Sequence, residues 1–516
     1  MSAEERDTVQ EALQSYIIEV LRNWIYTPPA LVNGVFLAIL VVTLILLIVE
    51  KINKTLTAMC GAVATIIAGR YFEVAYGWVP VVDAFLAYLQ GSAPRLKPLL
   101  FTSEQVLTEM VDWQSIVIVI SLLIVSSIVS RSGLFEYIGV KLVKMGGGDF
   151  RRIFIYFCVL TFALTAMMGA VPAFVIIVSL TLTLTRSLGI DPKPYILGEL
   201  FVGIHAGIAT LTSNVGNIVV ASHYNMNSSY FLDYGGFLLI GAPFAATCSA
   251  ISILIIQRSF KEVMTPAESD EFSSLRERVL SLDESSLIEN RAIFRRTILL
   301  LALMIVGFII ANPIGIPLYV VALSAAIAFL ILGGIEPRKA ILEVDWELML
   351  FLLGIFIVIG GVCSTGVLNT AGEIIGSLAL GNMPAMILMT IITSTVFSGV
   401  LEDVPVAVVL LYVIPVASLS ALVSEKAAVW ALIYGMNIGS ILTPVGETRI
   451  ILALSVLSKD GSPVSGTEFM KLSIPILVLS ILIGVAFIYG LALILGWNTI
   501  TPEQIITLLT SPTTAL

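Results

Sequence analysis

The sequence predicts an all-α polytopic membrane protein made of two inverted repeats, each with about five crossings, a re-entrant hairpin and a broken helix. Of its 516 residues, 58% are hydrophobic and only 12% are charged, a composition too apolar for a soluble protein of this length. Several uncharged runs are long enough to cross a bilayer. Short patterns also recur at one fixed offset, which indicates an internal duplication.

The duplication is visible at an offset of 233 positions. Two adjacent acids followed by Val-Pro form the second copy of a pattern whose first copy has no charge. The matched segments, in chain order, are Val111-Asp112-Trp113 with Val344-Asp345-Trp346, Gly133 with Gly366, Gly139 with Gly372, and Gly169-Ala170-Val171-Pro172 with Glu402-Asp403-Val404-Pro405. Four matches in the same order predict that the chain is two copies of one design.

Charge and cysteine usage exclude several classes of protein. The net charge of −9 offers no basic patch suited to nucleic acid. The four cysteines stand singly, so the spacing predicts neither disulfides nor a zinc or iron–sulfur site, and two histidines cannot build a metal centre. We therefore expect no cofactor. The first apolar run, 31–49, is long enough to remain as a span, so we expect a multi-pass protein of the plasma (inner) membrane, surrounded by lipid.

The first repeat, residues 1–257, begins with a possible amphipathic helix over 9–26. Spans follow at 31–49, 57–69 and 114–130. An insertion at 71–112 separates the second span from the third, and its sequence leaves open whether it is interfacial or oligomer-forming. The basic cluster Lys141, Lys144, Arg151 and Arg152 predicts a cytoplasmic face.

Residues 153–185 carry no formal charge and are interrupted at Met168 to Pro172. About 15 residues on either side reach only ~22 Å at ~1.5 Å per residue, short of a ~30 Å bilayer core. We therefore expect a re-entrant hairpin, whose turn must be buried in protein or line a wet cavity. A helix over 195–211 is then expected to break at 212–217 and to resume at 218, and a span at 237–256 returns to the cytoplasm.

A charged cytoplasmic linker, 258–296, joins the first repeat to the second, 297–516. The second repeat is expected to cross at 297–311, 317–332 and 348–362. Its hairpin covers 386–424 and has its tip at Glu402 to Pro405. A helix over 430–442 leads to a second break at 443–449, and the last span is 469–495. Five crossings per half is an odd number, which predicts that the second copy is inverted.

Inverted repeats with interrupted segments at matching places are typical of secondary transporters, and the interruptions point to the binding site. The two tips and two breaks are expected to meet at mid-membrane. The site residues that this predicts are Gly169, Ala170, Thr212, Ser213, Asn214, Asn217, Glu402, Asp403, Thr443, Gly446, Glu447, Thr448 and Arg449. Oxygen-rich surroundings suit hard ions such as Na⁺, while helix capping is an equally good explanation for any single small polar residue.

The predicted charges favour a cation. Glu402, Asp403 and Glu447 outnumber Arg449, so the site should hold a cation, transported or coupling, at Glu402 and Asp403, or keep one carboxyl protonated. Arg449 either contacts an anion or neutralises an acid structurally. His205, two turns before the first break, either relays protons or is simply hydrogen-bonded to a neighbouring helix.

The run Gly207-Ile208-Ala209-Thr210-Leu211, with Asn217 after it, resembles the Gly-Gly-x-Ala-Thr-Leu-Ile-Gly-Asp-Pro-Pro-Asn signature of the ion-transporter superfamily. That superfamily includes arsenite-efflux permeases, D-type sodium/proton antiporters, the P protein and citrate transporters. Asn437-Ile438-Gly439 with the following Leu442 to Gly446 is similar to the second-half signature, which adds Asn437 to the expected site. The resemblance covers about residues 35–490 and implies a scaffold part, a moving transport part, an ion gradient as driving force and often a homodimer.

The chain departs from that pattern at the tips, where the superfamily commonly has Asp-Asn, so the substrate cannot be carried over. We expect a secondary active transporter that moves a small ion coupled to H⁺ or Na⁺, with cation/proton antiport favoured. The alternative is transport of arsenite, citrate or another small anion, with Arg449 as its contact. An intramembrane enzyme using Glu402 and Asp403 as an acid dyad is disfavoured, because catalytic acids need not sit in matched repeats.

Overall fold

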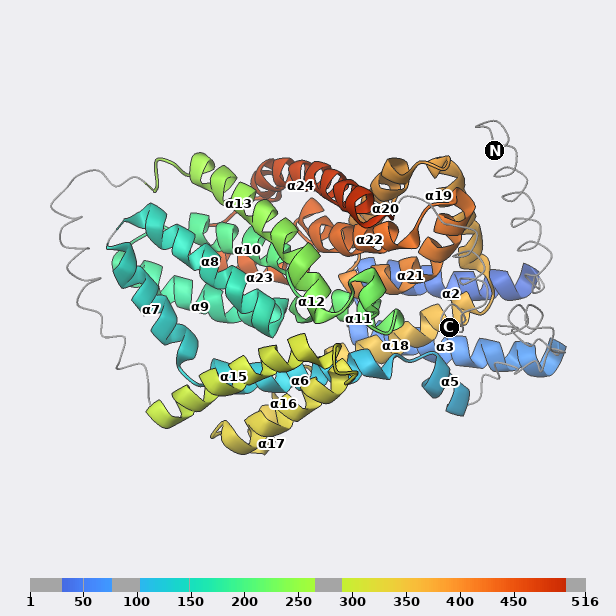
Figure 1. Cartoon of the computed structure of the whole chain (residues 1–516), viewed down its shortest axis with the longest axis horizontal. Helices are drawn as coiled ribbons and strands as arrows, with labels where there is room; N and C mark the ends of the chain where they lie inside the picture. The colour runs from blue at the N-terminus through green and yellow to red at the C-terminus, as the bar shows by residue number, and fades with distance from the viewer. Residues whose placement is uncertain (1–29, 50, 77–102, 148, 265–289, 498–516) are drawn as a thin grey trace.

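A computed structural model describes residues 30–49, 51–76, 103–147, 149–264 and 290–497. Throughout these ranges the regular elements are helical (Figure 1). Ten helices in the described ranges are long and apolar enough to cross a membrane. The predicted all-α, polytopic class is therefore confirmed. The amphipathic helix expected at 9–26 lies outside the described residues, as do most of the insertion at 71–112 and most of the linker.

The first half contains the longer list of elements. They are α2 (Ala30–Val49), α3 (Lys54–Tyr76), α5 (Ser103–Glu109), α6 (Trp113–Ser130), α7 (Leu134–Gly146), α8 (Phe150–Met168), α9 (Ala170–Leu188), α10 (Lys193–Ala206), η1 (Leu211–Ser213), α11 (Val215–His223), η2 (Ser228–Tyr230), α12 (Tyr234–Gly236), the π-helical η3 (Phe237–Gly241) and α13 (Ala242–Ser259).

The second half repeats this order from its first long helices onward. Its elements are α15 (Arg291–Ala311), α16 (Leu318–Leu332), α17 (Pro337–Leu342), α18 (Trp346–Cys363), α19 (Val367–Ala379), α20 (Met383–Ser398), α21 (Asp403–Ala421), α22 (Glu425–Gly439), η5 (Ser440–Leu442), α23 (Thr448–Lys459) and α24 (Gly466–Leu495). Helix α15 begins at Arg291, so the last residues of the predicted linker are its first turns.

Matched local contacts support the duplication. Asp112 caps α6 and Asp345 caps α18, each accepting from a backbone N–H three residues on, at 3.1 and 3.0 Å. The hydroxyl of Thr210 donates to the carbonyl of Ala166, and that of Thr443 to the carbonyl of Gly399, both at 2.7 Å. The two donors, Thr210 and Thr443, are 233 positions apart, and so are the two acceptors, Ala166 and Gly399. The opposite orientation of the two copies stays a prediction.

The two halves exchange their second helices, α3 and α16. Helix α3 packs against α18 of the second half, and α16 packs against α6 of the first (Figure 1). The contact between α3 and α18 is close: a Cβ added to Gly354 would lie 2.7 Å from the carbonyl carbon of Ala58. Only a residue without a side chain allows the backbones to approach to this distance, as is common between membrane helices.

The arms of the first hairpin are longer than predicted. Helices α8 and α9 have 19 residues each, or ~28 Å at ~1.5 Å per residue, and the estimate of about 15 residues was wrong. The Asp149 carboxylate accepts from the N–H groups of Arg151 and Arg152, which starts α8 before the uncharged stretch. Helices of this length could either cross the bilayer or turn back within it. The re-entrant hairpin therefore stays a prediction.

The breaks lie earlier than predicted in both halves. Helix α10 ends at Ala206 and α11 begins at Val215, so the first break covers 207–214 rather than 212–217. Asn214 is the reason, because its side chain caps α11 by accepting from the Gly216 N–H at 3.0 Å. In the second half α23 begins at Thr448, so Thr448 and Arg449 belong to its first turn and not to the break.

Candidate functional site

A cavity of about 590 Å³ lies where the hairpin tips meet the breaks. The first tip contributes Gly169 and Ala170, and the second contributes Glu402 and Asp403. The breaks contribute Thr212 and Asn214 from the first half, and Glu447 and Thr448 from the second. Residues of α6, α18 and the start of α3 complete the wall. Four segments far apart in the sequence thus surround one space.

A chain of side-chain amides connects the first break to the second tip. Asn214 Nδ2 donates to Asp403 Oδ2 at 2.5 Å and to Asn437 Oδ1 at 2.7 Å. Asn437 Nδ2 donates to Asn217 Oδ1 at 3.0 Å, and Asn217 Nδ2 donates to the Gly207 carbonyl at 2.7 Å. Each amide orients the next one. Among the described residues, the hydrogen bond to the other oxygen of Asp403 comes from the Ser398 hydroxyl at 3.5 Å, which is too long for a strong bond and leaves that oxygen available to a ligand.

Glu402 belongs to a different network from its neighbour Asp403. Its Oε1 accepts from Lys54 Nζ at 2.6 Å and from Thr448 Oγ1 at 3.0 Å. Its side chain is 30% exposed, whereas Asp403 is bonded inside the amide chain. The adjacent acids therefore line the same cavity in two different surroundings.

Arg449 lies behind the cavity wall rather than on it. Its Nε donates to Glu447 Oε1, and its Nη1 donates to the Gly203 carbonyl at 3.0 Å. The side chain is only 2% exposed and is absent from the cavity lining. Glu447 does line the cavity, and within the described structure its Oε2 is buried without a hydrogen-bond partner. This geometry supports the structural role for Arg449 and gives the anion-contact role no support.

Several predicted site residues shape the breaks instead of lining the cavity. Ser213 donates to the carbonyls of Gly207 and Thr210, and Thr443 bonds to a hairpin carbonyl as described above. Gly446 lines a second cavity of about 20 Å³, which shares Lys54, Phe351 and Glu402 with the first. These contacts agree with the capping role that the sequence left open for the small polar residues.

His205 lies away from both cavities. Its Nε2 is 3.2 Å from the Ser480 hydroxyl and its Nδ1 is 3.3 Å from that of Ser252, on α24 and α13. The side chain is fully buried. This arrangement is that of a histidine hydrogen-bonded between neighbouring helices, the second of the two roles expected from the sequence.

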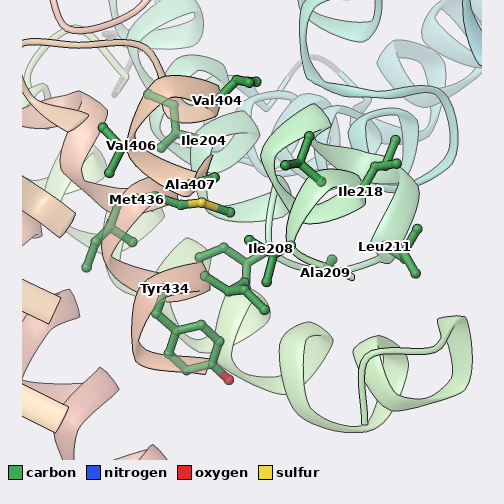
Figure 2. Close-up of a cluster of buried hydrophobic side chains, with 14 of the residues drawn as sticks. Ile204, Ile208, Ala209, Leu211, Ile218, Val404, Val406, Ala407, Tyr434 and Met436 are labelled. Atoms are coloured by element: carbon green, nitrogen blue, oxygen red, sulfur yellow. The ribbon is translucent and has the colours of Figure 1, made fainter. Parts of the chain in front are cut away.

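An apolar cluster lies beside the amide chain. Buried Ile204, Ile208 and Ala209 of the first half belong to the same cluster as Val404, Val406 and Ala407 of α21 and Met436 of α22 (Figure 2). Between helices inside a membrane such side chains are held together by van der Waals packing rather than by removal from water. The first break therefore shares one apolar core with α21 and α22, which helps to position the polar groups around the cavity.

The citrate transporter family model matches residues 44–435, more than half of the chain. This chain belongs to the citrate transporter family. An uncharacterized transporter of Mycobacterium bovis is 24% identical over 469 residues, covering 88% of this chain and 97% of that protein. The arsenical pump membrane protein of Escherichia coli is 23% identical over 405 residues, covering 77% of this chain and 89% of the pump.

A solved structure has the same fold. It is MtrF of Neisseria gonorrhoeae, described as one of a class of antimetabolite efflux pumps, with a TM-score of 0.56 at 14% identity over 86% of this chain and 96% of MtrF. The expected membership of the ion-transporter superfamily is confirmed by the family match and the arsenical pump. The chain is a multi-pass integral transporter of the plasma membrane, and this family of transporters favours transport over enzymatic activity.

The cavity of this citrate transporter family member has charged residues that the sequence did not identify. Its charged lining comprises six acids and one lysine: Glu343, Asp345, Glu347, Glu402, Asp403, Glu447 and Lys54. The acids are spread around the wall, and the described residues contain no cluster of three His, Cys, Asp or Glu placed to hold a metal ion. Lys54 gave no signal in the sequence, because a lysine at the start of an apolar run usually marks only the membrane boundary.

Proposed function

We propose that this protein is a cation/proton antiporter that exchanges Na⁺, or another small hard cation, for protons. The observation that carries the proposal is that Glu447, which lines the cavity together with Asp403 and Glu402, has a buried Oε2 without a hydrogen-bond partner in the described structure. A buried carboxylate oxygen without a donor is costly. A bound cation or proton would remove that cost.

The acids suit an exchange mechanism. Carboxylate and amide oxygens are the ligands that hard cations prefer, and Asp403, Glu447 and Asn214 supply them from both halves. Because Asp403, Glu402 and Glu447 line the same cavity, their like charges repel one another, and the site favours occupancy by a cation or by protons over an empty, fully charged state. A cation that enters would then release protons, which couples the two fluxes.

The architecture supports alternating access. We propose that repeats 1–257 and 297–516 are inverted copies around the cavity, joined by the cytoplasmic linker 258–296, and that the protein forms a homodimer, as the superfamily resemblance implies. The segment 365–383, which contains α19, is then expected outside the cell. Cysteines placed singly in the linker and in this segment test the inversion by labelling intact cells from outside. Labelling of the linker but not of segment 365–383 would contradict the inverted arrangement.

A small anion is the second candidate substrate. Membership of the citrate transporter family and the likeness to an arsenical pump favour it. Within the described structure Lys54, rather than Arg449, is the basic side chain on the cavity wall. Six acids line the cavity, and three of them, Glu343, Glu402 and Glu447, are ion-paired with Arg131, Lys54 and Arg449. The remaining excess of carboxylates over basic groups disfavours a multiply charged anion such as citrate, which is why we place the cation first.

Transport into proteoliposomes distinguishes the two candidates. Vesicles that hold a pH-sensitive dye are loaded at acid pH, and Na⁺, K⁺ or choline is added outside. Antiport predicts loss of the acid interior with Na⁺ or K⁺ and none with choline. Uptake of labelled citrate or arsenite without any cation-dependent proton flux would refute the antiport proposal.

A further inference from the structure

Lys54 occupies a position that is unfavourable for a lysine on its own helix. It is the first residue of α3, and the N-terminal end of a helix disfavours cations because the helix dipole is positive there. Its Nζ lies 2.6 Å from Glu402 Oε1, and the two side chains are 32% and 30% exposed. Glu402 precedes α21 at its N-terminal end, where an acid is favoured. Glu402 thus neutralises the positive charge of Lys54, which the N-terminal end of α3 does not stabilise.

The ion pair connects the start of α3 with the hairpin tip between α20 and α21. The start of α3 is fixed to α18, because Thr55 Oγ1 donates to the Glu347 carbonyl at 2.9 Å and Ala58 packs closely against Gly354. Glu402 instead belongs to the tip between α20 and α21, and its second donor is Thr448 of α23. The Lys54 ammonium group, on a helix that is fixed to α18, therefore donates a hydrogen bond to Oε1 of Glu402 at the hairpin tip. Both residues line the cavity.

We propose that Lys54 is a tethered counter-ion that competes with the transported cation for Glu402. This inference rests on the proposed cation transport. With the site empty, Lys54 neutralises Glu402 and ties the second hairpin tip to α3 and α18. An entering cation displaces the ammonium group from Glu402, which weakens this tie as the site fills. Lys54 therefore lowers the affinity of the site for the cation. It also holds the second hairpin tip to α3 only while no cation is bound at Glu402.

The test measures Na⁺ binding to the purified full-length protein in detergent. Melting temperature is followed while NaCl replaces choline chloride at constant ionic strength, since a ligand that binds the folded state raises its stability. Lys54→Met should lower the Na⁺ concentration at half-maximal stabilisation by about two- to five-fold, the ratio that a partly exposed ion pair supports. Lys54→Arg should stay close to wild type. Lys51→Met, an exposed lysine just before α3, is the matched control.

A double variant makes the test specific to the pair. Once Glu402→Gln has removed the carboxylate, adding Lys54→Met should change the Na⁺ midpoint no further, because there is no competition left to relieve. An unchanged or higher midpoint in Lys54→Met, with a Na⁺ response in the wild type, would overturn the counter-ion role alone. A wild-type protein that neither Na⁺ nor K⁺ stabilises would overturn the proposed function and this inference together.

Discussion

Asn437→Ala is predicted to weaken both the fold and ion binding, because Asn437 is the middle of the amide chain. The substitution strands two buried groups: one N–H of Asn214, which loses its acceptor at 2.7 Å, and Oδ1 of Asn217, which loses its donor at 3.0 Å. A buried polar group left without a partner costs about 1–3 kcal/mol. The expected loss of stability is therefore about 2–6 kcal/mol, the sum of the two groups.

The assay is a melting temperature in detergent, combined with Na⁺-dependent proton flux in proteoliposomes. The second bond of Asn214 holds Asp403, so an Asn214 side chain released from Asn437 should also place Asp403 less firmly and reduce flux. Asn369→Ala, a partly exposed asparagine of α19, serves as the control. If Asn437→Ala had the same melting temperature as Asn369→Ala and transported at the wild-type rate, the amide chain would not be what positions the site residues.

Three further predictions follow from the same geometry. Asp403→Asn should leave a folded protein whose flux no longer follows an imposed Na⁺ or pH gradient; flux at the wild-type rate under either gradient would place coupling elsewhere. Arg449→Ala should lower the free energy of unfolding by about 3–5 kcal/mol, because it leaves the buried Glu447 carboxylate unpaired. Adding Glu447→Gln should restore most of the melting temperature. A double variant that melts no higher than Arg449→Ala would contradict the pairing. Gly435→Ala should cost about 1–3 kcal/mol by overpacking, because its Cβ would lie 1.9 Å from a serine hydroxyl of α20. Gly490→Ala has nothing within 4 Å and should be neutral or stabilising in the same melt.

The sequence predicted the segments of the site better than the individual contacts. Repetition at a fixed offset and Pro or Gly within apolar runs are local signals, and they located the tips that contain Gly169 and Asp403. The end of the first break was wrong because one side-chain cap, at Asn214, decides where α11 begins; no side-chain cap marks the start of α23 after the second break. The length of the first hairpin was wrong for the same reason at Asp149. Caps move helix ends by a few residues without altering the apolar pattern from which the limits were predicted.

Contacts between distant segments were beyond the reach of a single sequence. Nothing near Lys54 indicates that Glu402, 348 positions away, is its partner. The pairing of Arg449 with Glu447 rather than with the tip acids depends on how α23 is rotated, which the spacing of the residues does not determine. These contacts arise from packing, and the predicted roles of the site residues await the experiments above.

The exchange of α3 and α16 between the halves bears on how such a protein could have originated. A single copy of the repeat would leave its own α3 or α16 equivalent without the surface that it packs on here, since that surface belongs to the other copy. A half-length ancestor would therefore have needed a second chain to complete its fold, and gene fusion would have joined partners that were already intertwined. The same geometry means that two fragments separated within the linker should be unstable in detergent when produced alone and should form a stable complex when coexpressed.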